Sequence, residues 1–250
     1  AAGALVFAPI ITDDISHKKF STSKNSRSFE QPERVSRHLN KREGRLLFNY
    51  DRVDWELFSR LPENAQLIYI YALQNVTTNY AIVDKPTAHL FFIDKDKQLI
   101  AENPCLLGKT PGEEPNKASE DNDWSYYATT PAGSYEVGFI NIADEDIQAY
   151  GQGNIMRIYY DDVNISIHPP TVEGEEATRK KALKTPTPED NAITGGCINS
   201  FLAYDIKDVF HEGDRIFITP TDSQQWISPE TGRVLPANKL RETLIKFKEN

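Results

Sequence analysis

The feature that most constrains the fold is a series of short segments rich in aromatic and β-branched residues, separated by turn signals at intervals of about ten residues. These segments are 67–73, 80–84, 89–94, 98–103, 133–140, 154–160, 163–168 and 215–220. The polar run DKDK at 94–97 predicts a hairpin tip between two of them, and Asp161-Asp162 predicts another. The pattern predicts a mainly β fold with a compact sheet or barrel.

Three segments predict helices. The segment 51–60 (DRVDWELFSR) predicts a short helix that ends at Leu61-Pro62, because the residue before a proline avoids the helical region. The segment 201–210 (FLAYDIKDVF) predicts a second helix, and the apolar spacing within 240–247 predicts a terminal amphipathic helix. The polar stretch 12–45 is typical of an arm or linker.

Composition narrows the functional class. Apolar residues make up 39% of the 250 residues and charged residues 26%, which is typical of a globular chain rather than a disordered one. The net charge of -9 argues against binding to nucleic acid by counterion release. No apolar run is long enough to span a membrane; the longest, 1–11, is consistent with the start of an exported chain or with part of a signal peptide.

The two cysteines, Cys105 and Cys197, are too few for a disulfide framework and lack the clustering of a zinc site. Cys197 lies in ITGGCIN at 193–199, where two glycines allow a substrate close approach to the main chain. Such a loop can direct amide groups at an oxyanion, and a following helix would favour the thiolate. Cys197 is therefore a candidate nucleophile, and a buried structural cysteine beside a glycine turn is the alternative.

A nucleophilic cysteine needs a base, and His168 is the best placed of the five histidines. It ends the predicted strand 163–168 and precedes Pro169-Pro170, where a long loop begins. A structural strand-end histidine is the alternative. Of the other four, His17 and His38 are expected to be solvated side chains of the polar arm. His89 is expected to be a strand residue, and His211 a turn residue.

Taken in order, these motifs resemble the catalytic core of the L,D-transpeptidases, the YkuD family. The family has a strand-end His, a loop, Ser/Thr-His-Gly-Cys-x-Asn/Arg, a helix and a final strand, which VNISIHPP at 163–170 and TGGCINSFLAYDIKDVFHEGDRIFITP at 194–220 resemble. The hairpins of 80–109 and the element Thr-Pro-Ala-Gly at 130–133 agree. The resemblance implies a YkuD-like β-sandwich or barrel over 76–220, after a partly helical N-terminal extension (1–75) and before a helical tail (221–250).

The resemblance also assigns roles to individual residues. Cys197 would be the acyl-accepting nucleophile, His168 its general base, and the backbone carbonyl of Pro169 the third member of the triad. The amides of Gly196 and Cys197 would form the oxyanion hole. The substrate-binding candidates, from the motif and from the residues themselves, are Thr194, Gly195, Asn199, Arg157, Trp124 and Tyr127.

Two departures from the family pattern stand out. Gly195 replaces the usual histidine of the motif, which leaves the presumed base intact but changes the surroundings of the nucleophile. The loop 169–193 is longer than usual and carries Arg179, Lys180, Lys181 and Lys184. These cations would contact the carboxylates of a peptide stem, or they form a solvated charge run.

The implied activity is an L,D-transpeptidase that attacks peptidoglycan tetrapeptide stems, forms a thioester on Cys197 and makes 3-3 cross-links in the periplasm or cell envelope. Water as the acceptor would instead give an L,D-carboxypeptidase. A papain-like hydrolase and a catalytically impaired wall-binding module are further alternatives. We expect no cofactor and no metal, because no HExxH, P-loop or G-x-G-x-x-G motif is present. Cys105 is expected to be a buried thiol that does not pair with Cys197.

Overall fold

The computed structural model describes residues 53–113, 128–140, 155–160, 163–171, 174–185, 188–204, 209–222, 224–228 and 232–236, and all structural statements concern these. The predicted polar arm (12–45) and the predicted terminal helix (240–247) lie outside them. No helix in the described part of the chain is long and apolar enough to cross a bilayer.

The centre of the fold is a mixed sheet of eight strands in the order β3-β2-β1-β10-β5-β6-β7-β9. Its strands are β1 (Tyr80–Asp84), β2 (His89–Ile93), β3 (Leu99–Pro104), β5 (Gly133–Ile140), β6 (Ile155–Tyr160), β7 (Val163–His168), β9 (Ile198–Asn199) and β10 (Arg215–Ile218). The pairs β1–β10 and β7–β9 are parallel, and the other neighbours are antiparallel. The mainly β prediction is confirmed.

Two small two-stranded sheets lie outside the central one. β4 (Leu107–Gly108) pairs in parallel with β8 (Ala192–Thr194), and β11 (Gln225–Ile227) pairs with β12 (Val234–Pro236). The hairpin tip predicted at 94–97 is present, because the Lys97 amide donates to the Asp94 carbonyl at 3.0 Å between β2 and β3.

The helical elements are α1 (Trp55–Arg60), α2 (Glu63–Asn75), α4 (Glu176–Ala182) and the 3-10 helices η3 (Pro188–Asn191) and η4 (Phe201–Tyr204). α1 confirms the helix expected before Leu61-Pro62, and the Asp54 side chain caps it by accepting from the Leu57 amide at 2.9 Å. Of the helix predicted over 201–210, the described residues contain only η4.

The strand prediction for 67–73 is wrong, because these residues form the middle of α2. The side chains of this segment are apolar or aromatic and are buried on nearly all sides of the helix. The sequence therefore shows neither the single apolar face of a surface helix nor the polar–apolar alternation of a strand. Periodicity alone does not separate a buried helix from a buried strand in such a run.

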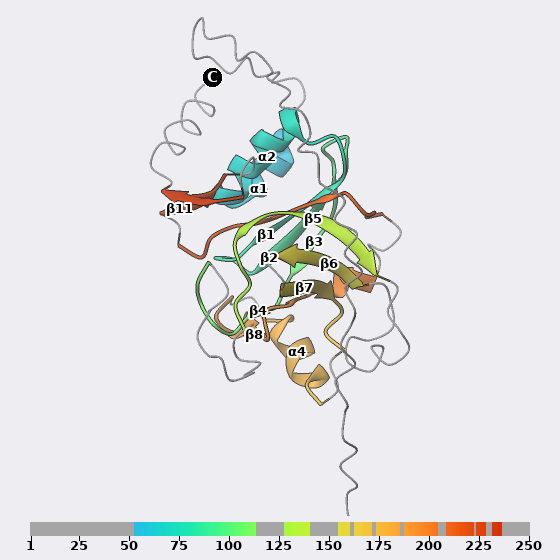
Figure 1. Cartoon of the computed structure of the whole chain (residues 1–250), viewed down its shortest axis with the longest axis vertical. Coiled ribbons are helices and arrows are strands. Elements are labelled where there is room, and N and C mark those ends of the chain that lie inside the picture. The colour runs from blue at the N-terminus through green and yellow to red at the C-terminus, as the bar shows by residue number, and fades with distance from the viewer. Residues whose placement is uncertain are drawn as a thin grey trace, which may run out of the picture. The chain divides into compact units, whose positions relative to one another are not determined.

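The sheet is covered on both faces, and β1 shows how. Tyr80 and Ile82 belong to the core cluster that α1 and α2 complete, whereas Ala81 and Val83 belong to a second core on the other face. Figure 1 shows α2 over one face of the sheet and α4 at the opposite end, beside β4 and β8. α2 thus shares a core with the sheet, while the domain limits at 75/76 and 220/221 stay predictions.

Candidate active site

The pairing of β7 with β9 places the predicted base beside the predicted nucleophile loop. His168 is the last residue of β7 and is in register with Asn199 of β9, directly after the Cys197-Ile198 step. The strands are parallel, so two segments that are distant in sequence reach the same end of the sheet. Cys197 is partly exposed, and His168 is only 1% exposed.

The His168 ring is held by a backbone carbonyl. Its Nδ1 lies 2.8 Å from the Pro169 carbonyl oxygen, which can only accept, so Nδ1 carries a proton. In a neutral ring, Nε2 then holds the lone pair that a base needs. Pro169 therefore lies where the sequence resemblance expects the third member of a triad.

The surroundings of His168 favour its uncharged form. Burial lowers the pKa of the imidazole to about 4, the Pro169 hydrogen bond opposes this, and the charge of Arg179 adds to the lowering. At neutral pH the ring is therefore uncharged, with its proton on Nδ1.

The Asn199 amide lies against the His168 ring. Its Nδ2 is 2.9 Å from His168 Nε2 and 3.5 Å from Nδ1, while its Oδ1 accepts a hydrogen bond from Arg179 Nη1. Both ends of the amide are thus bonded to protein groups, and the side chain is fully buried. The Asn199 amide therefore supports the site from its buried side and is not exposed on the surface.

The Gly-Gly-Cys turn has two unlike glycines. Gly196 has φ +108°, a conformation that L side chains rarely adopt, whereas Gly195 is exposed and has open space at its Cβ position. The Thr194 hydroxyl donates to the Cys197 carbonyl at 2.6 Å and accepts from the Gly196 amide at 3.2 Å. In this structure the Gly196 amide, one of the predicted oxyanion donors, therefore faces Thr194.

Thr130 fixes this turn from outside. Its buried hydroxyl accepts from the Gly108 amide at 2.8 Å and donates to the Gly196 carbonyl at 2.9 Å. The Lys109 amide donates to the Thr194 carbonyl at 2.9 Å, so β4 and the turn are tied at two points. Sequence reasoning used Thr130 only as part of the Thr-Pro-x-Gly element and missed this contact.

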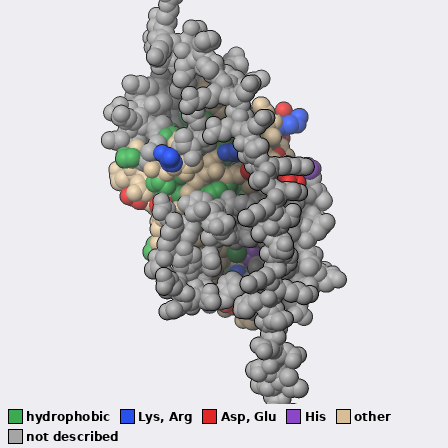
Figure 2. Space-filling view, viewed as in Figure 1, with side chains coloured by type: hydrophobic (Ala, Val, Ile, Leu, Met, Phe, Trp, Pro, Cys, Tyr) green, Lys and Arg blue, Asp and Glu red, His purple; other side chains and the backbone are tan. Residues whose placement is uncertain are grey.

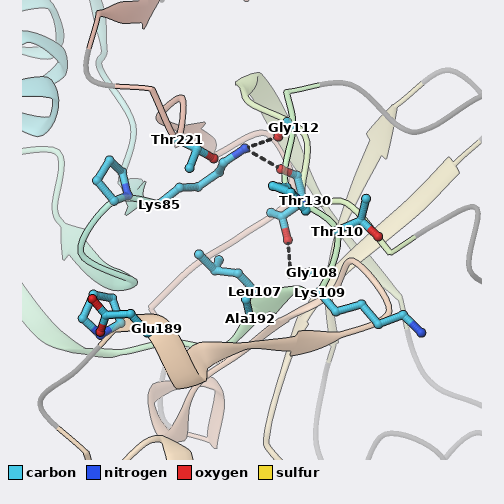
Figure 3. A pocket seen from close by; sticks show the side chains of 13 residues that line it. Lys85, Leu107, Gly108, Lys109, Thr110, Gly112, Thr130, Glu189, Ala192 and Thr221 are labelled. Carbon is cyan, nitrogen blue, oxygen red and sulfur yellow. Dashed lines mark hydrogen bonds between the residues drawn. The ribbon is translucent and has the colours of Figure 1, made fainter.

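A cavity of about 390 Å³ opens beside this contact, lined by Lys85, Gly108, Lys109, Thr130, Glu189 and Ala192 among others. Figure 3 shows Lys85 and Thr130 on its wall, with Thr130 reaching Gly108. Lys85 Nζ is committed to the protein, because it donates to the Gly112 and Thr130 carbonyls at 2.6 and 3.0 Å and to Glu113 Oε2 at 2.7 Å. Burial lowers its pKa, and Glu113 opposes the change.

The cations of the 169–193 loop divide into two groups. Arg179 is buried on α4 and points inward to Asn199, whereas Lys181 and Lys184 are exposed and Lys180 pairs with Glu176. The sequence marked all four as one charge run and did not single out Arg179. Figure 2 shows Lys and Arg scattered over the face viewed, without a continuous basic patch among the described residues.

The remaining predicted residues are only partly placed. Arg157 is in register with Ser166 of β7, but the structure does not describe its side chain, and Trp124 and Tyr127 lie outside the described residues.

Cys105 is fully buried and is not joined to Cys197, as predicted. Burial raises the pKa of its thiol far above the usual range. No group of three metal-ligating side chains occurs among the residues that the structure describes.

No family model and no curated protein matches the sequence. Among solved structures, the helical cell shape determining protein Pgp2 from Campylobacter jejuni is similar at 18% identity and a TM-score of 0.39, over 58% of this chain and 49% of Pgp2. The L,D-transpeptidase from Mycobacterium smegmatis is similar at 15% identity and a TM-score of 0.31, over 56% of this chain and 58% of that one.

L,D-transpeptidase 1 from Mycobacterium tuberculosis is similar at 13% identity and a TM-score of 0.33, over 57% of this chain and 61% of that one. The chain spans about half the length of the first of these structures. The solved structures similar to this chain thus include L,D-transpeptidases, the family that its sequence motifs resemble.

Proposed function

We propose that this chain is an L,D-transpeptidase that uses Cys197 as its nucleophile and His168 as its general base. The observation that carries the proposal is the β7–β9 pairing, which sets a His168 ring with its proton fixed on Nδ1 by Pro169 next to the glycine turn of Cys197. A ring so fixed offers Nε2 as the base, which is the role that a cysteine nucleophile requires.

The proposed first step is acyl transfer to the thiol. Cys197 Sγ loses its proton to His168 Nε2 and attacks the carbonyl between the third, L-centred residue of a tetrapeptide stem and the terminal D-Ala. A C–S bond forms, the C–N bond breaks, and the imidazolium gives its proton to the departing amine of D-Ala.

The low basicity of His168 affects how this step begins. With a pKa of about 4, the His168 imidazole is uncharged at neutral pH and can accept the thiol proton at Nε2. Proton transfer then accompanies attack on the carbonyl. The same weak basicity makes the imidazolium a strong acid toward the leaving amine.

The second step defines the product. An amine from a neighbouring stem attacks the thioester and gives a 3-3 cross-link, and water gives a tripeptide stem, the product of an L,D-carboxypeptidase. Peptidoglycan stems are the partner in both cases, and the site of action is the bacterial cell envelope.

The test is acylation followed by intact mass spectrometry. The protein is incubated with a carbapenem and, separately, with muropeptide tetrapeptides. We expect a covalent adduct that is lost in Cys197→Ala and kept in Cys105→Ala, the matched control at the buried thiol. Absence of both adduct and muropeptide turnover would contradict the proposal and favour a wall-binding module. A cross-linked dimer identifies transfer, and a tripeptide identifies hydrolysis.

A further inference from the structure

Arg179 connects the long 169–193 loop to the candidate base. Its Nε and Nη2 donate to Glu175 Oε2 at 2.9 and 2.6 Å, one helical turn earlier, and its Nη1 donates to Asn199 Oδ1. Asn199 then contacts His168, and His168 contacts the Pro169 carbonyl. A chain of hydrogen bonds thus runs from a surface carboxylate through a buried guanidinium to the imidazole.

The guanidinium decides which way round the Asn199 amide lies. An arginine has donors and no acceptor, so the amide must turn its oxygen toward Arg179 and its NH₂ toward the ring. The NH₂ group lies 2.9 Å from Nε2 and 3.5 Å from Nδ1, so its partly positive hydrogens face the ring and suit a neutral imidazole better than an imidazolium. A flipped amide would present its oxygen to Nε2 and would favour a proton at that nitrogen.

The positive charge of Arg179 acts in the same direction. It lowers the pKa of His168, because a second cation nearby disfavours the imidazolium. Glu175 lies on the far side of the guanidinium, and its side chain is 58% exposed against 9% for Arg179. The Pro169 carbonyl and the Asn199 amide also contact the ring. Arg179 is thus the cation of the network, and Glu175 partly offsets its charge.

We propose that Arg179 is a positioning residue of the active site, which fixes the Asn199 amide against the ring and, together with its own charge, keeps His168 uncharged. The inference rests on the proposed function in one respect only, that His168 is the base. It gives the long 169–193 loop a role at the catalytic base, in place of a contact between Arg179 and substrate carboxylates.

The test follows the His168 ring by NMR in ¹⁵N-histidine-labelled protein, with His168→Gln used to assign the signal. Between about pH 5 and pH 8, we expect the wild-type ring to stay neutral as the Nδ1–H tautomer, with its titration midpoint near pH 4. Arg179→Met removes both the positive charge and the hydrogen bond that fixes the Asn199 amide, so the titration midpoint of His168 should rise by about one pH unit. Lys181→Met, which removes an exposed cation from the same helix, should leave the midpoint unchanged.

Glu175→Gln distinguishes the positioning role of Arg179 from a general loss of packing of helix α4. This variant leaves Arg179 in place but removes the compensating charge, so the midpoint should fall further. General loosening would hydrate the ring and raise the midpoint in both variants. Arg179→Lys keeps the charge but loses the guanidinium fork, and it should rescue the midpoint only in part. If Arg179→Met does not fold, the direction of the Glu175→Gln shift decides the question.

The two proposals fail in different ways. An unchanged His168 midpoint and tautomer in folded Arg179→Met, or a rise in Glu175→Gln, overturns the positioning role even if the wild type is acylated by a carbapenem. The expected NMR shifts in a protein that forms no acyl-enzyme would instead leave the network intact and overturn the proposed function. In an active enzyme, Arg179→Met should also lower kcat for tetrapeptide stems more than it changes KM, because the residue does not touch substrate.

Discussion

Thr130→Val tests the hydroxyl that ties β4 to the nucleophile turn. Valine has nearly the same shape as threonine, so the substitution removes the hydrogen bonds with little change in packing. The buried Gly108 amide, at 2.8 Å, loses its acceptor, and the Gly196 carbonyl, at 2.9 Å, loses its donor. An unsatisfied buried polar group costs about 1–3 kcal/mol, so we expect a loss of about 3 kcal/mol after local relaxation.

Two measurements follow from this loss. In a chain of this size about 1 kcal/mol corresponds to roughly 2–4 °C, so the thermal midpoint should fall by about 6–12 °C. The rate of Cys197 acylation by a carbapenem, measured by intact mass well below the new midpoint, should also fall, because the turn loses the hydrogen bond that fixes the Gly196 carbonyl; a loss of about 1.4 kcal/mol in the transition state would lower the rate roughly tenfold. Thr130→Ser keeps the hydroxyl and is the matched control. Equal midpoints and equal acylation rates for the valine and serine variants would refute the reasoning.

Three further predictions concern the same site. Gly195→His, which restores the usual family residue, should change the thermal midpoint little, because the Cβ position is open and Gly195 is not in the left-handed region; a large loss would contradict this geometry. Gly196→Ala should cost about 1–3 kcal/mol in denaturant unfolding, since φ is +108° there. Burial lowers the folded pKa of His168 to about 4, so its contribution to stability is complete above the unfolded value of about 6.5 and is lost on acidification. His168→Gln should therefore flatten the dependence of unfolding free energy on pH between about 4 and 6.5, by about 3 kcal/mol in all, and an unchanged slope would refute the assignment.

Much of the sheet could be predicted because its strands carry their own turn signals. The hairpin of β2 and β3 around 94–97 and the strand β7 ending at His168 both depend on local residues. The segment 67–73 was the exception, because a helix buried on most sides has no polar face to reveal its period.

The residues of the candidate site also fall into two groups: those that the sequence predicts and those that only the fold brings together. His168, Pro169 and Cys197 could be proposed from the order of motifs along the chain, without knowledge of contacts. The roles of Thr130 and Arg179 depend on where β4 and α4 lie relative to the glycine turn and Asn199. A single arginine within a run of lysines carries no sequence signal that it is buried, although its spacing from Glu175 predicts an i,i+4 pair.

The strand β9 is bonded along both of its edges. On one side it pairs with β7, and on the other both backbone groups of Asn199 bond to Leu106: the Leu106 amide donates to the Asn199 carbonyl at 2.8 Å, and the Asn199 amide donates to the Leu106 carbonyl at 3.0 Å. An amide held in this way exchanges with solvent only when the strand opens. The main chain of β9 is therefore a fixed part of the candidate site, and any local rearrangement around Cys197 has to leave this strand in place.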